Sequence, residues 1–360
     1  MPLVQNSSLP TFSRLRNSGV EVLQSDRAAK QDIRELHIGL LNLMPDAALE
    51  ATERQFFRLL GSCNRIAQFH IHPFTVTGVD RAEKAQAHID AYYQHFRDVV
   101  EEGLDALVIS GANPANPDIT QEGFWDQMLE VIDWASENVC STFYSCLATH
   151  AVIQHYHDLP REKLSEKRWG VYSHRVIAPH HPLVSNINTR FDAPHSHVYD
   201  TSPERARAAG WQVLVEGEES GLYLAVSADG FRHVYCQGHP EYDINSLLKE
   251  YKREVNRYIG GVREKPPYPK NYFPAPALEY LEEYLAKVDL ALDRGDGEAP
   301  SFPEESLLPM LENTWSDTGR AIFNNWLGQV YQITHRDRKI PFMDDVDPAN
   351  PLGLPADASN

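Results

Sequence analysis

A cysteine between a predicted strand and a predicted helix is the first residue whose position could support chemistry. Residues 140–145 are β-branched and aromatic, as in a buried strand, and residues 147–153 are small and apolar with helical spacing. No glycine or proline separates them, so Cys146 would project from a sharp turn at the amino end of a helix. The helix dipole and free N–H groups there favour a thiolate and could hold an oxyanion. The alternative is a buried structural cysteine.

A histidine after a second predicted strand could act as the base that such a nucleophile needs. His239 follows an apolar stretch and Gly238, and Glu241 lies two residues further on. A carboxylate there could accept the imidazole N–H, fix the tautomer and stabilise the imidazolium. Because the chain has 16 histidines, a loop histidine beside a surface acid is the alternative for His239 alone. The two patterns together favour nucleophilic catalysis.

Two cations precede a predicted strand, and a third lies on a predicted helix at residues 245–258. Lys167 or Arg168 could hold a carboxylate, although ordinary solvated side chains are the alternative. Arg253 could face the site or pair with Glu250 on its own helix.

A short polar stretch at residues 192–200 is predicted to form a rigid loop, because Pro194 precedes two histidines that flank Ser196. His195 and His197 could suggest a metal site. No second ligand cluster has suitable spacing, so we predict no metal.

Alternating strands and helices up to residue 156 predict the scaffold that positions these residues. The pattern is typical of an α/β fold with a mostly parallel sheet and helices on both faces, where sites form at the carboxyl ends of strands. Residues 111–116 and Cys146 both follow predicted strand ends, so we expect them to meet there. The predicted strands are 36–43, 69–76, 106–110 and 140–145, with helices at 49–60, 81–101, 124–136 and 147–153.

The second half adds short β segments at 171–178, 212–216, 222–227 and 233–237, which we interpret as antiparallel additions to the same sheet. Further helices are predicted at 278–294 and 315–334. The expected organisation is an N-terminal arm at 1–35, a catalytic α/β domain at 36–263, a Pro-rich wrap and docking helices of the same domain at 264–344, and a loose tail at 345–360.

Composition narrows the possible partners and location. The formal net charge of −18 argues against nucleic acid and anionic membranes as partners. Four cysteines in 360 residues are too few for a disulfide scaffold and fit reduced thiols in a cytoplasm. No signal peptide and no apolar run of membrane-spanning length is visible.

From about Leu9 to Asp337, the chain resembles the homoserine O-acyltransferase family of methionine biosynthesis, the branch related to class I glutamine amidotransferases. The most specific motifs are L-N-L-M-P (41–45), G-H-P-E-Y-D (238–243) and N-Y-F-P (271–274), in this order. Supporting motifs are S-G-A-N-P (110–114), S-E-K-R-W-G-V-Y-S-H (165–174), A-P-H-S (193–196) and N-W-L-G-Q-V-Y-Q-I-T (325–334). The family fold is a flavodoxin-like α/β sandwich, usually dimeric and cytoplasmic.

The resemblance implies a role for each candidate residue. Cys146 matches the acyl-carrying nucleophile, His239 the general base and Glu241 its partner. Lys167, Ser196 and Arg253 match substrate-binding positions. The oxyanion would be held by N–H groups of Leu147 and of the turn at Gly111 and Ala112. No bound cofactor is implied, and acyl-CoA and L-homoserine would react in ping-pong order.

The resemblance also bears on which acyl group is transferred. In the family, a large acid near Ala115 is associated with acetyl transfer and a small residue with succinyl transfer, so we expect succinyl-CoA. Acetyl-CoA as donor and serine as acceptor stay open. The chain has Leu147 to His150 where the family often has W-G-A-Q, so the wall beside the thiol differs. The stretch 277–308 is also longer than usual.

Two other functional classes remain as alternatives. A glutamine amidotransferase-like cysteine hydrolase would usually have G-x-C-x-G, but Tyr144 and Ala148 occupy the glycine positions. A non-enzymatic regulator on this fold would be expected to lose part of the Cys146, His239 and Glu241 set.

Overall fold

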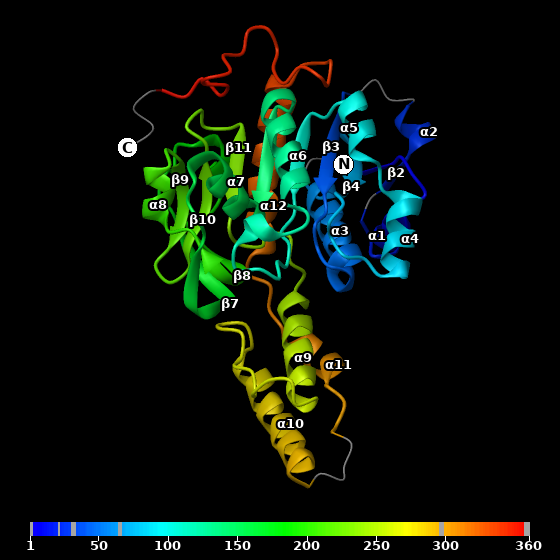
Figure 1. Ribbon diagram of the computed structural model, residues 1–360, viewed down its shortest axis with the longest axis vertical. Helices are drawn as coiled ribbons and strands as arrows, with labels where there is room; N and C mark the ends of the chain where they lie inside the picture. Colours follow the sequence, from blue (N-terminus) through cyan, green and yellow to red (C-terminus); the bar gives the residue numbers. More distant parts are fainter. Residues whose placement is uncertain (1–2, 21, 30–33, 64–66, 295–298, 356–360) are drawn as a thin grey trace.

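The computed structural model describes residues 3–20, 22–29, 34–63, 67–294 and 299–355. Within them, eleven strands form one sheet (Figure 1). The strand order across the sheet is β2 (Val22–Gln24), β1 (Leu3–Gln5), β4 (Gln68–Phe74), β3 (Glu35–Leu41), β5 (Ala106–Ile109), β6 (Ser141–Ser145), β11 (His233–Cys236), β10 (Gly221–Val226), β9 (Gln212–Gly217), β7 (Glu162–Val176) and β8 (Arg190–Asp200).

The sheet is parallel from β2 to β11 and antiparallel from β11 to β8. The predicted α/β fold and the antiparallel additions to one sheet are therefore confirmed. The predicted arm contributes β1 and β2 to the sheet edge, where β1 runs beside both β2 and β4.

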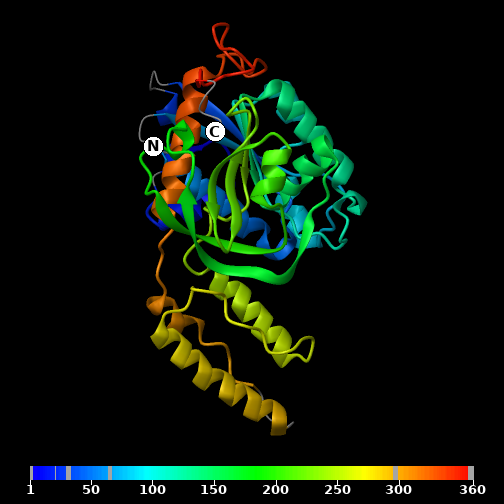
Figure 2. The ribbon, with the colours of Figure 1, turned by 90° about the vertical axis from the view of Figure 1, so that its left-hand side faces the viewer.

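Helices cover both faces because the central strands are apolar on both sides. In β3, Leu36, Ile38 and Leu40 belong to one buried cluster, while Leu41 belongs to the other. Figure 2 shows the sheet between the two helical layers. The first layer contains α1 (Pro10–Asn17), α3 (Asp46–Gly61) and α12 (Ser316–Ile333), and the second contains α5 (Phe96–Glu102), α6 (Trp125–Asn138), α7 (Leu147–His157) and α8 (Pro203–Ala208).

Several short elements complete the body. The predicted helix at 81–101 is divided into α4 (Glu83–Tyr92) and α5, because Gln94 between them makes an isolated bridge to Phe74. The remaining short helices are α2 (Ser25–Ala28), η1 (Ile119–Gln121) and η2 (Pro182–Val184).

A helical lobe projects beyond the carboxyl ends of the central strands (Figures 1 and 2). It consists of α9 (Ser246–Ile259), α10 (Ala275–Arg294), α11 (Glu304–Leu307) and η3 (Leu308–Met310). Tyr251 of α9 and Leu281 of α10 lie in one apolar cluster that is separate from the two on the sheet. The lobe thus begins before the predicted boundary at residue 264, and α10 packs on α9 while α12 packs on the sheet.

The rigid loop predicted at residues 192–200 is wrong, because these residues belong to strand β8. Phe191, Ala193, His195 and His197 alternate on the buried side of β8, but the histidines make this pattern look polar. Strand β7 is also longer than predicted, and the two strands pair in antiparallel register.

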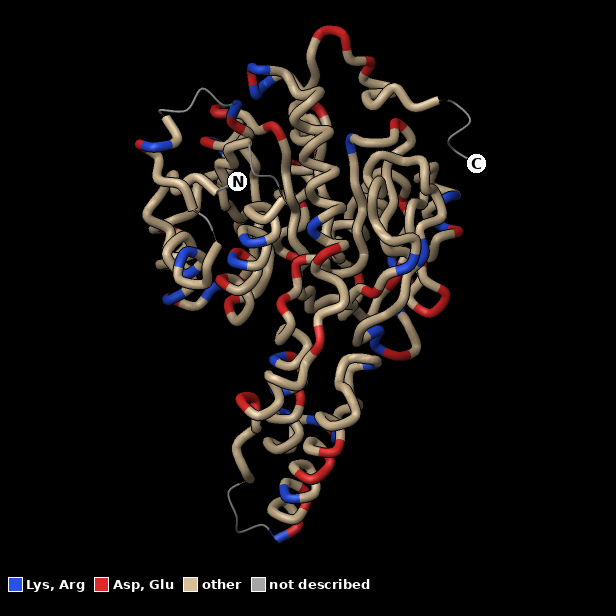
Figure 3. The backbone as a smooth tube through the Cα atoms, turned by 180° about the vertical axis from the view of Figure 1, so that it is seen from behind, with Lys and Arg blue, Asp and Glu red and all other residues tan. Residues whose placement is uncertain are grey.

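The C-terminal tail has no regular secondary structure but is attached to the body. Residues 345–355 are irregular, and Leu352 packs against the core. No helix in the described part of the chain combines the length and apolar character needed to cross a membrane. Figure 3 shows acidic and basic residues on both the body and the lobe.

Strand β7 is joined to the chain that leads into α10 at Gly170. Val171 N–H donates to the Lys270 carbonyl at 2.8 Å, and Lys270 N–H donates to the Trp169 carbonyl at 2.8 Å. Gly170 has φ +145°, and a Cβ atom there would lie 2.2 Å from the Lys270 carbonyl oxygen. A side chain at this position must therefore separate the two segments.

We expect Gly170→Ala to lower the free energy of unfolding by more than Gly261→Ala does. Gly261 has φ +70° with no heavy atom near its would-be Cβ, so its substitution has only the left-handed backbone cost of about 1–2 kcal/mol. Chemical denaturation of both variants measures the difference. Equal losses of unfolding free energy in the two variants would show that the close contact with Lys270 contributes nothing to stability.

Candidate active site

Cys146 lies at the sharp turn from β6 into α7. Its backbone has φ 51° and ψ −104°, a strained conformation for a residue with a side chain. The N–H of Cys146 donates to the Cys236 carbonyl of β11 at 2.7 Å, which holds this turn against the neighbouring strand. The thiol is free and half-buried, and it lines a pocket of about 270 Å³.

Backbone groups beside the thiol could hold an oxyanion. Leu147 is the first residue of α7, so its N–H has no partner within the helix. Gly111 is close enough that a Cβ atom there would lie 3.6 Å from the Cys146 Cβ. Gly111, Ala112 and Leu147 all line the pocket. Ala115 is exposed and does not line it, although Pro114 just before it does.

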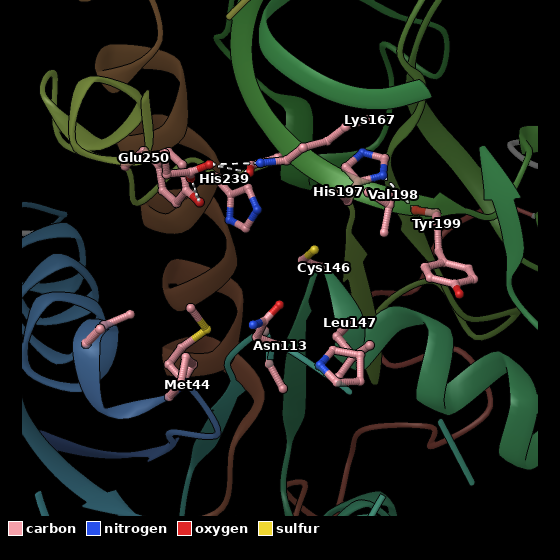
Figure 4. A pocket seen from close by; sticks show the side chains of 18 of the residues that line it. Met44, Asn113, Cys146, Leu147, Lys167, His197, Val198, Tyr199, His239 and Glu250 are labelled. Carbon is pink, nitrogen blue, oxygen red and sulfur yellow. Dashed lines mark hydrogen bonds and ion pairs between the residues drawn. The ribbon is translucent and has the colours of Figure 1, made fainter. Parts of the chain in front are cut away.

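The histidine and glutamate that the sequence placed together do lie together. His239 Nδ1 is 2.8 Å from Glu241 Oε1, and both side chains are buried. His239 Nε2 has no hydrogen-bond partner among the described residues, and the ring points into the same space as the thiol in Figure 4. Tyr242 stacks on the imidazole with 4.3 Å between ring centroids, which restricts ring rotation.

Electrostatics favour a charged imidazole. Burial by itself lowers the pKa of His239, but the negative charge of Glu241 and the interaction with the Cys146 thiol raise this pKa to about 10. The His239 imidazole is therefore held in its charged form beside the Cys146 thiol.

The opposite wall of the pocket holds a network around Glu250. Lys167 Nζ lies 3.2 Å from Glu250 Oε2, and the Ser196 hydroxyl donates to the same oxygen at 2.6 Å. The Tyr242 hydroxyl donates to Oε1 at 2.9 Å. Burial raises the pKa of Glu250, but the positive charge of Lys167 and these hydrogen bonds lower it overall, so the carboxylate stays ionised.

Two cations considered from the sequence have different positions. Arg253 lines the pocket from α9, and its Nε donates to Glu254 Oε1 at 3.1 Å, so it does not pair with Glu250. Arg168 is paired with Asp200 and does not line the pocket. From the sequence, Glu250 is expected only as a partner for Arg253. Their spacing of three residues on one helix could have placed both on the pocket face.

The two histidines considered for a metal bond to other groups. His195 Nδ1 lies 3.0 Å from His197 Nε2, and His195 Nε2 lies 3.0 Å from His174 Nε2. His197 Nδ1 donates to the Tyr199 carbonyl at 2.6 Å. The ring nitrogens of His195 and His197 are therefore occupied. Several other residues also line the pocket without a role predicted from the sequence, which are Met44, Pro45, Ala47, Ala48, His150, Val198 and Tyr199.

Known proteins give a consistent family assignment. Residues 2–336 match the model of the homoserine O-succinyltransferase family. A homoserine O-succinyltransferase from Methylococcus capsulatus is 57% identical and covers 98% of this chain and 100% of its own. Another, from Nitrosococcus oceani, is 56% identical, with 98% of this chain and 99% of its own covered.

Among solved structures, a glutamine amidotransferase from Thermotoga maritima has a TM-score of 0.40 at 10% identity, covering 83% of this chain and 98% of its own. One from Methylobacillus flagellatus has a TM-score of 0.42 at 11% identity, covering 82% and 95%.

The family match over nearly the whole chain and the full-length relatives above 50% identity lead to one conclusion. The chain belongs to the homoserine O-succinyltransferase family and is an acyltransferase of methionine biosynthesis.

Proposed function

We propose that this protein transfers a succinyl group from succinyl-CoA to the hydroxyl of L-homoserine through a thioester on Cys146. One observation carries the mechanism: a strained half-buried thiol and a buried histidine–glutamate pair line the same pocket. The family assignment supplies the reaction class.

In the first half-reaction, the Cys146 thiolate attacks the thioester carbonyl of the acyl donor. The N–H of Leu147, with those of Gly111 and Ala112, would stabilise the oxyanion. When the tetrahedral intermediate collapses, the carbon–sulfur bond to CoA breaks. The His239 imidazolium protonates the departing thiolate, so CoA leaves as a thiol and the acyl group stays on Cys146.

The second half-reaction uses His239 as a base. An acylated Cys146 has no negative charge, so one of the groups that raise the pKa of His239 is lost. The neutral imidazole then takes the hydroxyl proton of homoserine as its oxygen attacks the acyl carbonyl. Collapse releases the ester and restores the thiolate and imidazolium. Glu241 keeps the ring oriented throughout.

The network around Glu250 suits the amino-acid end of homoserine. The Glu250 carboxylate can accept the substrate ammonium group, and Arg253 and Lys167 can hold its carboxylate. Ser196 donates to Glu250 and so fixes the orientation of that carboxylate. The placement of both charges beside the thiol favours an amino acid as acceptor.

The succinyl donor and the setting of the enzyme remain proposals. Ala115 follows the pocket-lining Pro114 and adds neither bulk nor charge beside the pocket. Acyl-CoA is a co-substrate, with no bound cofactor proposed. The homodimer and the cytoplasmic location expected from the sequence stay predictions.

Initial rates with succinyl-CoA and acetyl-CoA, each with L-homoserine, test this proposal. We expect kcat/KM for succinyl-CoA to exceed that for acetyl-CoA. L-serine as acceptor and glutamine as an ammonia source serve as further substrates. A preference for acetyl-CoA, or ammonia release from glutamine at a comparable rate, would contradict the proposal.

Ala115→Glu adds a variant to the same experiment. A glutamate next to the pocket-lining Pro114 would place a negative charge beside the pocket and repel the succinyl carboxylate, so we expect the succinyl/acetyl ratio of kcat/KM to fall. Gln121→Glu is the matched control, since it adds the same charge at an exposed position away from the pocket.

Glu241→Gln tests the imidazolium–thiolate pair. Loss of the Glu241 charge lowers the pKa of His239, so His239 deprotonates at lower pH and the thiolate loses its counter-charge near neutrality. We expect alkylation of Cys146 by iodoacetamide at pH 7 to slow, because a neutral imidazole no longer stabilises the negative charge of the reacting thiolate. Peptide mass spectrometry measures the rate at this cysteine.

The control for this variant is Asp133→Asn, which removes a carboxylate from another histidine, His155, on an exposed part of α6 and α7. Its alkylation profile should match the parent protein. An unchanged profile in Glu241→Gln would show that Glu241 does not act on the thiol through His239.

A further inference from the structure

The polar side chains that line the pocket form two groups on opposite sides of the thiol. Figure 4 shows Cys146 between Lys167 and Glu250 on one side and Asn113 and Leu147 on another. The first group has a positive and a negative charge, which can bind the carboxylate and the ammonium group of an amino acid. Other polar residues of the pocket lining are Asn113, His150 and Tyr199, none of which is a carboxylate.

His150 is the most deeply buried of these three residues. It lies on α7 four residues after Cys146, is 2% exposed and forms part of the pocket wall. Cys146 immediately precedes α7, and His150 lies in the first turns of this helix and lines the same pocket. A group attached to the Cys146 sulfur can therefore extend to the wall formed by His150.

One nitrogen of His150 is bonded and the other is not. Nδ1 lies 3.0 Å from the Thr201 hydroxyl oxygen, while Nε2 is buried without a hydrogen-bond partner in the described part of the chain. Burial and the positive charge of Arg161 lower the pKa of His150 to about 3, against the raising effect of the nearby Tyr199 carbonyl, so the ring is neutral at physiological pH. If Thr201 donates to Nδ1, the single ring hydrogen lies on Nε2. A buried unpaired donor is unfavourable until a ligand supplies an acceptor.

A positive charge lies behind the same wall. The Arg161 guanidinium carbon lies 3.7 Å from the centre of the Tyr199 ring, and Tyr199 lines the pocket. Arg161 donates to the carbonyls of Asn116 and Pro117 but forms no ion pair with a described residue. Lys167 and Arg253, in contrast, are each paired with a glutamate. Glu122 and Asp118 act on the Arg161 charge without forming an ion pair with it, and this charge also acts on Cys146.

We propose that His150 Nε2–H, assisted by the Asn113 amide, binds the distal carboxylate of a dicarboxylic acyl group, and that Arg161 attracts it through the Tyr199 wall. This end of the pocket selects a donor with a terminal carboxylate over a neutral donor of equal length. The inference rests on the proposed function, since it explains how succinyl-CoA is chosen.

Succinyl-CoA and butyryl-CoA test it, because butyryl has a methyl group where succinyl has its carboxylate. His150→Leu removes both ring nitrogens. We expect its kcat/KM for succinyl-CoA to fall about tenfold or more, the effect of a lost hydrogen bond to a charged group, while butyryl transfer is retained. His150→Gln keeps an N–H donor and should preserve most of the selectivity. Thr201→Val removes the hydroxyl that directs the ring hydrogen to Nε2, so this variant should have a lower succinyl/butyryl selectivity.

His155→Leu is the matched control, because it removes a histidine from the outer side of the same helix. It should leave the succinyl/butyryl ratio unchanged. Thermal unfolding identifies variants that fail to fold. If His150→Leu is one of these, Thr201→Val and His150→Gln decide the question.

The outcomes separate the two proposals. A parent enzyme that prefers acetyl-CoA would overturn the succinyl donor itself. A parent enzyme that prefers succinyl-CoA, with equal succinyl/butyryl ratios in the parent, His150→Leu and Thr201→Val, would overturn only the role of His150. Equal losses in His150→Gln and His150→Leu would also overturn it, because ring packing would then explain both.

Discussion

The parallel pairing of β6 with β11 is the constraint on which the site depends. Ser145 pairs with Cys236 at the end of this ladder, and the next N–H, that of Cys146, donates to the Cys236 carbonyl. This contact holds the strained turn that presents the thiol and starts the segment leading to His239. Because both strands are central and buried on both faces, neither end can move without disturbing the core.

The antiparallel strands and the lobe supply the remaining residues of the pocket. The N–H of His239 donates to the Pro194 carbonyl of β8 at 2.9 Å, so the histidine loop is held from a second direction. Strand β7 brings Lys167 and β8 brings Ser196 to Glu250, which the lobe supplies from α9. The nucleophile and base thus belong to the sheet, while the groups suited to the amino acid come from elements that meet at its edge.

Much of the core scaffold could be predicted from the sequence, because its strands are continuous apolar runs separated by amphipathic helices. The positions of Cys146 and His239 followed from the same rule, since both come directly after such a run. Glu241 could be added because two residues across a proline leave little freedom.

The rest could not be predicted for physical reasons. Strand β8 contains His195 and His197 on its buried side, and a local pattern cannot show that their ring nitrogens bond to one another. Glu250 and Arg253 lie about a hundred residues from Cys146, and only the direction of α9 brings them to the pocket. His150 was visible beside the thiol, but its unpaired Nε2 depends on Thr201 and on the surrounding packing.

The central claim is that Cys146 carries the acyl group. The most direct measurement is mass spectrometry of the enzyme mixed with succinyl-CoA alone, followed by peptide mapping. The mechanism predicts one succinyl group on the peptide containing Cys146, lost when L-homoserine is added and absent in Cys146→Ala. A protein that turns over normally without ever forming this adduct, or a Cys146→Ala variant with full activity, would contradict it.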